Sequence, residues 1–305
     1  MDVTFRAPTQ SESESVRATV APGRSAAEHA WLYRAPAGSV QLCGFEGDRL
    51  VAHAGLVTRT AIVQGREKRF GELVDLYGVR PGYEVLAARG LLEEHAGPKS
   101  HVVVTKTVEG GGEEKLFGRL LGFEVLRTEV ELVREVAGDA PGEGEGAVRL
   151  ERFDEQARWL FDRCAGEWLA LTLRDDRFWN WRFVDRPGSP PILLGVRDAE
   201  GILRGVAVFA PDAMQVLDFL CPPVENEVGR RLFAALEAEA RARGGRELRM
   251  RLPERSPWFE VAQERGWRIR PTGRLQMARS FNRRLDDLAL RESFYATWAD
   301  EALGG

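Results

Sequence analysis

Two carboxylates stand inside an otherwise apolar segment of the chain. Glu72 and Asp75 lie within FGELVDLYG, residues 70–78, whose composition predicts a strand. A carboxylate beside a cleft can accept a proton from an ammonium group, so both are candidate general bases. On a regular strand, positions three apart point to opposite faces. One carboxylate would then face a cleft, and the other would face a helix layer or a partner.

A third candidate base is His53, which lies in the apolar segment VAHAGL. The ordinary pKa of imidazole is near neutrality, which suits a general base. A lone histidine in a strand is also an ordinary core residue whose ring nitrogens are hydrogen-bonded, and both interpretations are kept. No two histidines have the spacing of metal ligands, so no metal is expected.

The turn after the apolar strand could bind an anion. VRPGYEVLAAR, residues 79–89, joins that strand to a predicted helix, and free N–H groups at a helix start attract phosphates. A phosphate-binding turn normally carries several glycines, because the backbone must approach the anion closely. Here Gly82 is followed only by Ala87 and Ala88. The alternative is a plain helix start, in which Glu84 is a favourable first-turn charge.

The composition limits the class of protein. With 305 residues the chain is expected to form two domains, and its 44% apolar residues, 30% charged residues and net charge of −4 are typical of a globular protein. These values argue against a nucleic-acid surface, and no apolar run is long enough to span a membrane. Cys43, Cys164 and Cys221 lack paired spacing, which indicates neither disulfides nor a zinc site. A cytoplasmic protein is expected. Its oligomeric state stays open, with a homodimer as one possibility.

The two halves of the chain repeat one pattern. WLYRAPAG at 31–38 is echoed by WRFVDRPG at 181–188, and LVDLYGVRP at 73–81 by VLDFLCPP at 216–223. Asp75 and Gly122 are 47 positions apart, and Asp218 and Gly266 are 48 apart. This repetition predicts an internal duplication. The expected domains are 1–136 and 148–305, joined by the Gly/Pro-rich linker AGDAPGEGEGA at 137–147.

Each half is expected to be an α+β domain whose sheet is mixed and mostly antiparallel, with flanking helices. Glycine and aspartate turns within 44–56 and 195–209 predict hairpins. The other expected elements of the first half are strand 3–8, helices within 10–34, strands within 40–79, helix 84–96, strand 101–108, helix 113–121 and strand 123–134. The second half is expected to open with strand 148–153 and a helix over 155–173.

These landmarks resemble the GNAT superfamily of N-acetyltransferases, twice over. The resemblance rests on VDLYGVRPGY followed by a helix, and on LFGRLLGFEV, which is similar to the family's helix ending in a Leu-Gly-Phe turn. A tandem arrangement of this kind also occurs in Eis-like acetyltransferases. The resemblance implies that acetyl-CoA or another acyl-CoA is the co-substrate. The N-terminal domain is expected to bind it, because it keeps the longer Val-Arg-Pro-Gly-Tyr turn.

The resemblance also implies which residues contact the acyl-CoA. Backbone N–H groups of Tyr77, Gly78 and Val79 would polarise the acyl carbonyl. The pyrophosphate motif would fall on Glu84, Val85, Leu86, Ala87, Ala88 and Arg89. This sequence departs from the motif, which normally has a basic or amide residue where Glu84 stands and glycines where Ala87 and Arg89 stand.

The catalytic roles are assigned by the same resemblance. The family's proton-donating tyrosine is missing near the Leu-Gly-Phe turn, where Phe117 and Gly118 stand, so Tyr83 and Tyr77 are the nearest substitutes. Asp75 recurs as Asp218, which favours a shared structural acid. Glu72 has no counterpart and is therefore the preferred base.

The expected activity is transfer of an acyl group, most simply acetyl, to a primary amine of a small molecule or peptide bound between the lobes. A catalytically inactive binding or structural protein is the alternative, because the motif and the tyrosine have both drifted. A third reading is an aminoacyl-tRNA-dependent transferase with the same doubled architecture, and the acidic charge balance argues against it.

Overall fold

The computed structural model describes residues 3–96, 102–136, 146–281 and 287–301. The chain divides into two units. Unit 1 consists of Met1–Ala61, Glu67–Glu129 and Gly273–Arg291, and unit 2 of Ile62–Arg66, Val130–Thr272 and Glu292–Gly305. Each unit therefore takes segments from both halves of the sequence. The predicted domains, 1–136 and 148–305, are continuous segments and do not include such shared segments. Most of the predicted linker, 137–145, lies outside the described residues, and the linker stays a prediction.

Unit 1 contains most of the N-terminal half. Its elements are β1 (Thr4–Arg6), α1 (Ser13–Val20), α2 (Ala26–Leu32), β2 (Ser39–Glu46), β3 (Arg49–Val63), β4 (Arg66–Gly78), α3 (Tyr83–Leu91), η1 (Leu92–Ala96), β5 (Val102–Val108), α4 (Gly112–Lys115) and η2 (Leu116–Leu120). Parts of β6 (Glu124–Glu135), β13 (Arg268–Ser280) and α9 (Asp287–Ser293) complete it.

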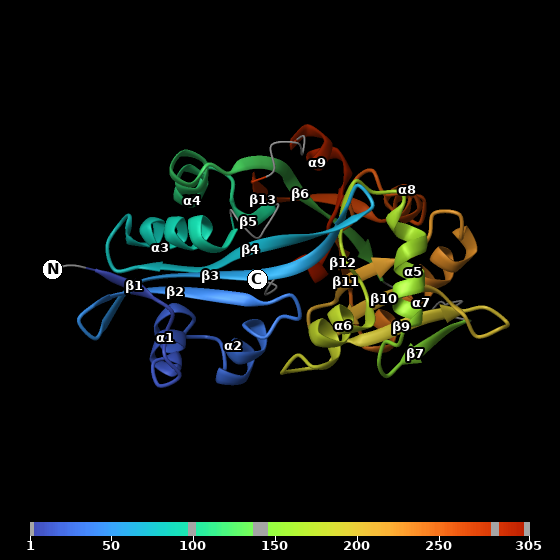
Figure 1. The fold of residues 1–305 in the computed structure, drawn as a ribbon. Coiled ribbons are helices and arrows are strands. Elements are labelled where there is room, and N and C mark those ends of the chain that lie inside the picture. The colour runs from blue at the N-terminus through green and yellow to red at the C-terminus, as the bar shows by residue number, and fades with distance from the viewer. Residues whose placement is uncertain (1–2, 97–101, 137–145, 282–286, 302–305) are drawn as a thin grey trace. The chain divides into compact units, whose positions relative to one another are not determined.

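The sheet of unit 1 has the strand order β1-β2-β3-β4-β5-β13-β6. The pairs β1–β2, β2–β3 and β5–β13 are antiparallel, and β4–β5 is parallel. Helices α1 and α2 lie on one face of this sheet, and α3 and α4 on the other (Figure 1). Helix α3 turns Val85, Ala88 and Leu92 towards the core at helical spacing, where they pack with Leu56 and Val103 of the sheet.

Unit 2 contains most of the C-terminal half. Its elements are β7 (Ala147–Leu150), α5 (Gln156–Ala165), β8 (Ala170–Thr172), α6 (Asp176–Trp179), η3 (Asn180–Val184), β9 (Ile192–Arg197), β10 (Leu203–Ala210), β11 (Gln215–Leu220), α7 (Asn226–Ala242), β12 (Glu247–Met250), α8 (Pro257–Glu264), β14 (Phe294–Tyr295) and η4 (Trp298–Asp300). The helix predicted over 155–173 ends at Ala165. That prediction is wrong for Ala170–Thr172, because these residues form β8 and pair with β14.

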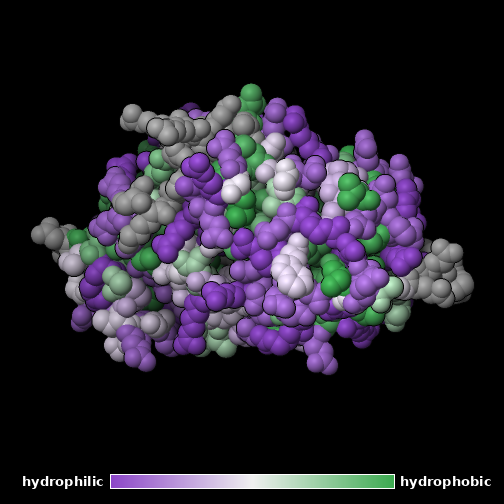
Figure 2. All heavy atoms as spheres, turned by 45° about the vertical axis from the view of Figure 1, so that its right-hand side comes forward, coloured by the Kyte–Doolittle hydropathy of each residue, from purple (hydrophilic) through white to green (hydrophobic). Residues whose placement is uncertain are grey.

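The same topology recurs in unit 2. Its strand order is β7-β9-β10-β11-β12-β6-β13, with the parallel pair β11–β12 in the place of β4–β5. A second parallel pair, β8–β14, lies outside this order. The pairs β7–β9, β9–β10, β10–β11 and β12–β6 are antiparallel. The predicted fold class is confirmed: two α+β domains in tandem, each a mixed and mostly antiparallel sheet flanked by helices. Polar side chains dominate the face drawn in Figure 2, and apolar ones lie between them in small groups.

Candidate active site

The parallel strands of unit 1 part soon after they meet. Strand β4 pairs with β5 only where Phe70–Glu72 lie opposite Val102–Val104. One residue further on, the hydroxyl of Thr105 lies 3.5 Å from the carbonyl oxygen of Leu73. The last residues of β4 have no register partner on β5 among the described residues. The backbone groups on that side form an edge, which we call the open edge of β4 and define as the backbone of Leu76 and Gly78.

Strand β4 is irregular where the open edge begins. Asp75 has a φ of 53°, in the left-handed region that non-glycine residues rarely adopt. The expectation that Glu72 and Asp75 face opposite sides depended on a regular strand. It does not apply, because the chain turns at Asp75 and the alternation is interrupted.

The side chain of Asp75 is fully engaged. Arg24, in the segment between α1 and α2, donates from Nη1 and Nη2 to its two oxygens at 2.6 and 2.8 Å, and the Tyr33 hydroxyl donates at 2.9 Å. Burial would raise the pKa of Asp75, but the hydrogen bonds and charge of Arg24 outweigh it and lower the pKa. Asp75 is therefore a bonded anion, which matches the interpretation as a shared structural acid.

His53 is also satisfied within the protein. Its Nδ1 donates to the backbone oxygen of Asp75 at 2.6 Å, and its Nε2 lies 3.2 Å from the side-chain amide of Gln41. The residue is fully buried, and burial lowers its pKa. These contacts favour the core-residue interpretation, in which a neutral imidazole pins the backbone at Asp75.

Glu72, the preferred base, forms a buried ion pair. Its carboxylate accepts a hydrogen bond from Nη2 of Arg59 on β3, and the two side chains are 10% and 5% exposed. A substrate proton would have to reach an oxygen that Arg59 leaves available.

The three predicted carbonyl-polarising amides differ in their availability. The N–H of Val79 donates to the carbonyl oxygen of Val51 on β3 at 2.9 Å, so it is not free for a ligand. Because neighbouring residues of a strand point their backbone groups to opposite edges, Gly78 directs its N–H away from β3. Tyr77, like Val79, is turned towards β3. Of the three, Gly78 alone contributes to the open edge.

The start of α3 lies against Gly78. A Cβ at Gly78 would come within 2.8 Å of the Glu84 nitrogen and 2.3 Å of Glu84 Oε2, so only glycine fits there. The carboxylate of Glu84 accepts a hydrogen bond from the N–H of Gly82, which is the N-cap with a φ of 96°. Glu84 therefore places its own negative charge at the positive end of α3.

The other residues of the predicted pyrophosphate motif lie along α3. Val85, Ala87 and Ala88 are buried in the core, and Leu86 is exposed. Arg89 donates to the carbonyl oxygen of Leu120 at 3.2 Å. Tyr83, the predicted substitute proton donor, directs its hydroxyl to Glu46 at 3.1 Å. The sequence neighbours Tyr83 and Glu84 thus have separate partners on the two sides of the helix start.

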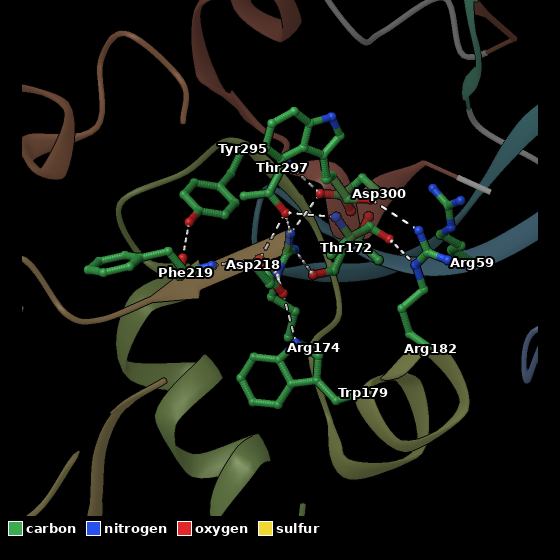
Figure 3. Close-up of polar contacts among 12 residues, drawn as sticks. Arg59, Thr172, Arg174, Trp179, Arg182, Asp218, Phe219, Tyr295, Thr297 and Asp300 are labelled. Atoms are coloured by element: carbon green, nitrogen blue, oxygen red, sulfur yellow. Dashed lines mark hydrogen bonds and ion pairs between the residues drawn. The ribbon is translucent and has the colours of Figure 1, made fainter. Parts of the chain in front are cut away.

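Unit 2 repeats the buried acid in a different setting. Asp218 on β11 accepts hydrogen bonds from Arg174, Trp179 Nε1 and Thr297 at 2.8–3.2 Å (Figure 3). Arg174 also donates to Asp300 at 2.6 Å, and both arginine and acid are fully buried or nearly so. The pKa of Arg174 is raised because Asp218 and Asp300 outweigh the effect of its burial.

In unit 2, protein side chains occupy the edge that corresponds to the open edge of β4. Counting from Asp75 and Asp218, Leu76 and Gly78 correspond to Phe219 and Cys221. The carbonyl oxygen of Phe219 accepts a hydrogen bond from the Tyr295 hydroxyl (Figure 3), and that of Cys221 accepts one from Trp258 Nε1 at 2.7 Å. The Trp258 ring also lies on Gly229 of α7. Side chains of the protein therefore occupy the hydrogen-bonding groups of this edge of unit 2, and we call the edge sealed.

The position of unit 1 that corresponds to Trp258 has no aromatic side chain. Trp258 stands eight residues before Gly266, and the residue eight before Gly122 is Glu114. Glu114 belongs to α4, which contributes no buried residue and whose Glu114 carboxylate accepts a hydrogen bond from the N–H of Gly110. The two units thus share a topology and differ at the edge where the parallel strands part.

Known structures share this architecture. A conserved protein of unknown function from Enterococcus faecalis V583 matches with a TM-score of 0.66 at 12% identity, over 95% of this chain and 74% of that chain. A GCN5-related N-acetyltransferase from Kribbella flavida matches with a TM-score of 0.62 at 15% identity, over 92% and 71% of the two chains. Saccharomyces cerevisiae N-myristoyltransferase with bound myristoyl-CoA matches with a TM-score of 0.59 at 9% identity, over 92% and 79%.

The chain has the GNAT fold in tandem. No protein-family model and no curated protein matches the sequence. The fold is therefore recognised through its strand order, the equivalent parallel pairs β4–β5 and β11–β12, and the parting of β4 from β5.

Sequence reasoning missed the arginines that bind the repeated acids of the GNAT units. Arg24 and Arg174 each stand immediately before a helix N-cap, Ser25 and Asp175 respectively. Each also lies 14 residues before the glycine of the echoed segments, Gly38 or Gly188. Extending the repeat upstream by seven residues would have found them.

No group of histidine, cysteine and acidic residues able to hold a metal ion occurs among the described residues. In the same part of the chain, no helix is long and apolar enough to cross a membrane.

Proposed function

We propose that this protein is an N-acyltransferase that moves an acyl group, most simply acetyl, from an acyl-CoA to a primary amine of a small molecule or peptide. The acyl-CoA would bind unit 1. The observation that carries this proposal is the contrast between the units: side chains of the protein bond the backbone of Phe219 and Cys221, whereas no side chain of the described residues bonds the backbone of Leu76 or Gly78. The likeness to an N-myristoyltransferase solved with myristoyl-CoA supports it.

The residues of unit 1 fit a thioester with an extended amide-bearing arm. Backbone N–H and C=O groups on the open edge can bond amides of such an arm, as a strand would. The N–H of Gly78 can stabilise the negative charge that develops on the thioester oxygen. The first N–H groups of α3, at Glu84 and Val85, have no partners within the helix and point to where phosphates would lie.

The reaction requires balanced proton movements. The amine nitrogen bonds to the carbonyl carbon, the carbon–sulfur bond breaks, the amine loses a proton and the thiolate gains one. Glu72 is the proposed proton acceptor, through the oxygen that does not bind Arg59. Tyr83 is the proposed donor only if it exchanges its bond with Glu46 for one with the thiolate.

A second candidate function follows from Glu84. Its carboxylate already lies at the start of α3, where it would repel a pyrophosphate by about 1 kcal/mol when solvated. A catalytically inactive GNAT-like binding or structural protein is the function that this observation favours.

Acetyl-CoA binding distinguishes the two candidates. For the wild-type protein, we expect millimolar acetyl-CoA to raise the melting midpoint by a few degrees, since a tenfold excess over Kd stabilises by about 1.4 kcal/mol. The Glu84→Gln variant should bind acetyl-CoA several-fold more tightly, because it removes the competing charge. Glu227→Gln is the matched control, since Glu227 is the second residue of α7 as Glu84 is of α3. It should leave the affinity unchanged.

The inactive alternative has its own signature in this experiment. If acetyl-CoA, CoA and long-chain acyl-CoA all leave the melting midpoint of both wild type and Glu84→Gln unchanged, the transferase proposal is wrong. The amine acceptor, the absence of a nucleic-acid or membrane partner, the homodimer and the cytoplasmic location remain predictions.

A further inference from the structure

A buried arginine–aspartate–aromatic anchor occurs once in each unit. In unit 1 it consists of Arg24, Asp75 and Tyr33, and in unit 2 of Arg174, Asp218 and Trp179. In both, the arginine precedes a helix N-cap, the acid lies on the strand before the parallel crossover, and the aromatic side chain donates to the acid. The duplication has kept the arginine and the acid, whereas the aromatic donors hold different positions: counting from the arginines, Tyr33 corresponds to Phe183 and Trp179 to His29.

Both anchors bind the strand at an irregularity. In unit 1 the acid itself has a left-handed backbone. In unit 2 the register between β10 and β11 shifts at the acid, because Val208 pairs with Asp218 while Phe209 pairs with Val216. The anchor therefore marks the place where the strand bends before its edge parts from the neighbouring strand.

In unit 1 the anchor stabilises an unfavourable backbone conformation at Asp75. A left-handed backbone is sterically unfavourable at a non-glycine residue, although aspartate tolerates it better than most. Three contacts oppose this cost: the bidentate bond from Arg24, the hydroxyl of Tyr33, and the His53 ring on the backbone oxygen. Gly55 leaves room for Tyr33, since a Cβ there would lie 2.1 Å from the tyrosine hydroxyl.

We propose that Arg24 and Tyr33 are positioning residues for the acyl-CoA: by holding Asp75 in its left-handed conformation, they fix the direction of the open edge of β4. This inference rests on the proposed function. Neither side chain is required to touch the ligand. They act through Asp75, whose backbone determines where Leu76 and Gly78 point.

The duplicated anchor provides matched controls. Arg24→Gln in unit 1 is compared with Arg174→Gln in unit 2, and Tyr33→Phe with Trp179→Phe. Each pair removes the same kind of bond to an equivalent acid, but the unit 2 anchor serves an edge that is already sealed. The measurements are the Kd of acetyl-CoA by titration calorimetry, the free energy of unfolding in urea, and amide exchange of residues 76–78 without ligand.

Arg24→Gln should raise the Kd at least tenfold, and the milder Tyr33→Phe about three- to tenfold, with faster exchange at 76–78 in both. Arg174→Gln and Trp179→Phe should lower stability while leaving the Kd within twofold of wild type. If Arg24→Gln does not fold, Tyr33→Phe decides the question, because it removes only one hydrogen bond.

An unchanged Kd and unchanged exchange in the folded unit 1 variants would overturn the inference, and so would an equal rise in Kd in the unit 2 controls. If the wild-type protein binds no acyl-CoA, the proposed function is wrong. The statement that Arg24 and Tyr33 position the acyl-CoA is then wrong as well. The exchange comparison then still determines whether the anchor sets the edge.

Discussion

At the scale of single residues, the sequence shows that an acid in an apolar strand is unusual, but it does not show which role that acid has. Asp75 and Glu72 look alike in the sequence, yet one anchors a bent backbone through Arg24 and Tyr33, and the other pairs with Arg59 on the next strand. The repetition of Asp75 as Asp218 favours a structural role, and each acid binds an arginine of its own unit. The partners could not be predicted, because Arg24 and Arg174 lie 51 and 44 residues from their acids.

Stability at mildly acidic pH should depend on His53. Burial lowers the pKa of His53 and, likewise, that of His29 below the unfolded value of 6.5. The unfolded chain therefore binds more protons as the pH falls through about 6.5, so the free energy of unfolding should decrease between pH 7.5 and 5.5. In His53→Gln this decrease should be smaller by up to about 1 kcal/mol, as measured by urea unfolding at the two pH values.

Asp75 does not interfere in this range: its pKa is lowered from 3.8, so the stability that it contributes is lost only below about pH 4. An identical pH dependence in His53→Gln and wild type would show that His53 does not titrate differently on folding.

At the scale of elements, hydrophobic patterning predicted the strands and helices well but not their irregularities. The strand–turn–helix from β4 to α3 was expected, and Gly82 does cap the helix with a positive φ. The left-handed backbone at Asp75 could not be predicted, because aspartate rarely requires it and the cause lies in distant partners. The same limit applies to β8, whose strand conformation depends on pairing with β14 more than a hundred residues later.

The junction of β4 and α3 should not tolerate a side chain at Gly78. In Gly78→Ala, the new Cβ would lie 2.8 Å from the Glu84 nitrogen, so the start of α3 must move. We expect a loss of about 1–3 kcal/mol in the free energy of unfolding and weaker acetyl-CoA binding. Urea unfolding and calorimetry measure the two effects. Gly118→Ala, whose Cβ would meet nothing closer than 3.7 Å, should have neither; equal effects of the two substitutions would contradict the crowding argument.

At the scale of the whole molecule, the sequence predicted the internal duplication. It did not predict that β6 and β13 each contribute residues to both units. Equal spacings in the two halves predicted two copies of one topology, which the matching strand orders confirm. Nothing in the spacing of β6 and β13 indicated that each would contribute residues to both units. Strand partners separated by more than a hundred residues leave no local pattern, since any strand of suitable polarity could take that position.

The C-terminal segment should stabilise unit 2 specifically. Residues 294–301 are bound there by three buried arginines. Arg174 donates to Asp300 (Figure 3). Arg182 donates to the Trp298 and Ala299 carbonyls, and Arg251 pairs with Glu301. In Asp300→Asn, the loss of charge opposite Arg174 should lower the stability by about 2 kcal/mol. Amide exchange should speed up in β8 and β11, and stay as in wild type in β1 and β2.

Glu292→Gln serves as the control, because that residue pairs with the exposed Arg255 rather than with a buried arginine. Faster exchange spread evenly over the two units after Asp300→Asn would argue against a local role for the segment.

The late position of β13 in the chain has a consequence for biosynthesis. Residues 274–280 complete the sheet of unit 1 by pairing with β5, but they follow nearly all of unit 2 in the sequence. The ribosome makes the chain from its N-terminus, so unit 1 must wait, with one side of β5 uncovered, until residues 274–280 have been synthesised. Nascent chains halted before residue 268 should therefore need chaperones that shield exposed strands.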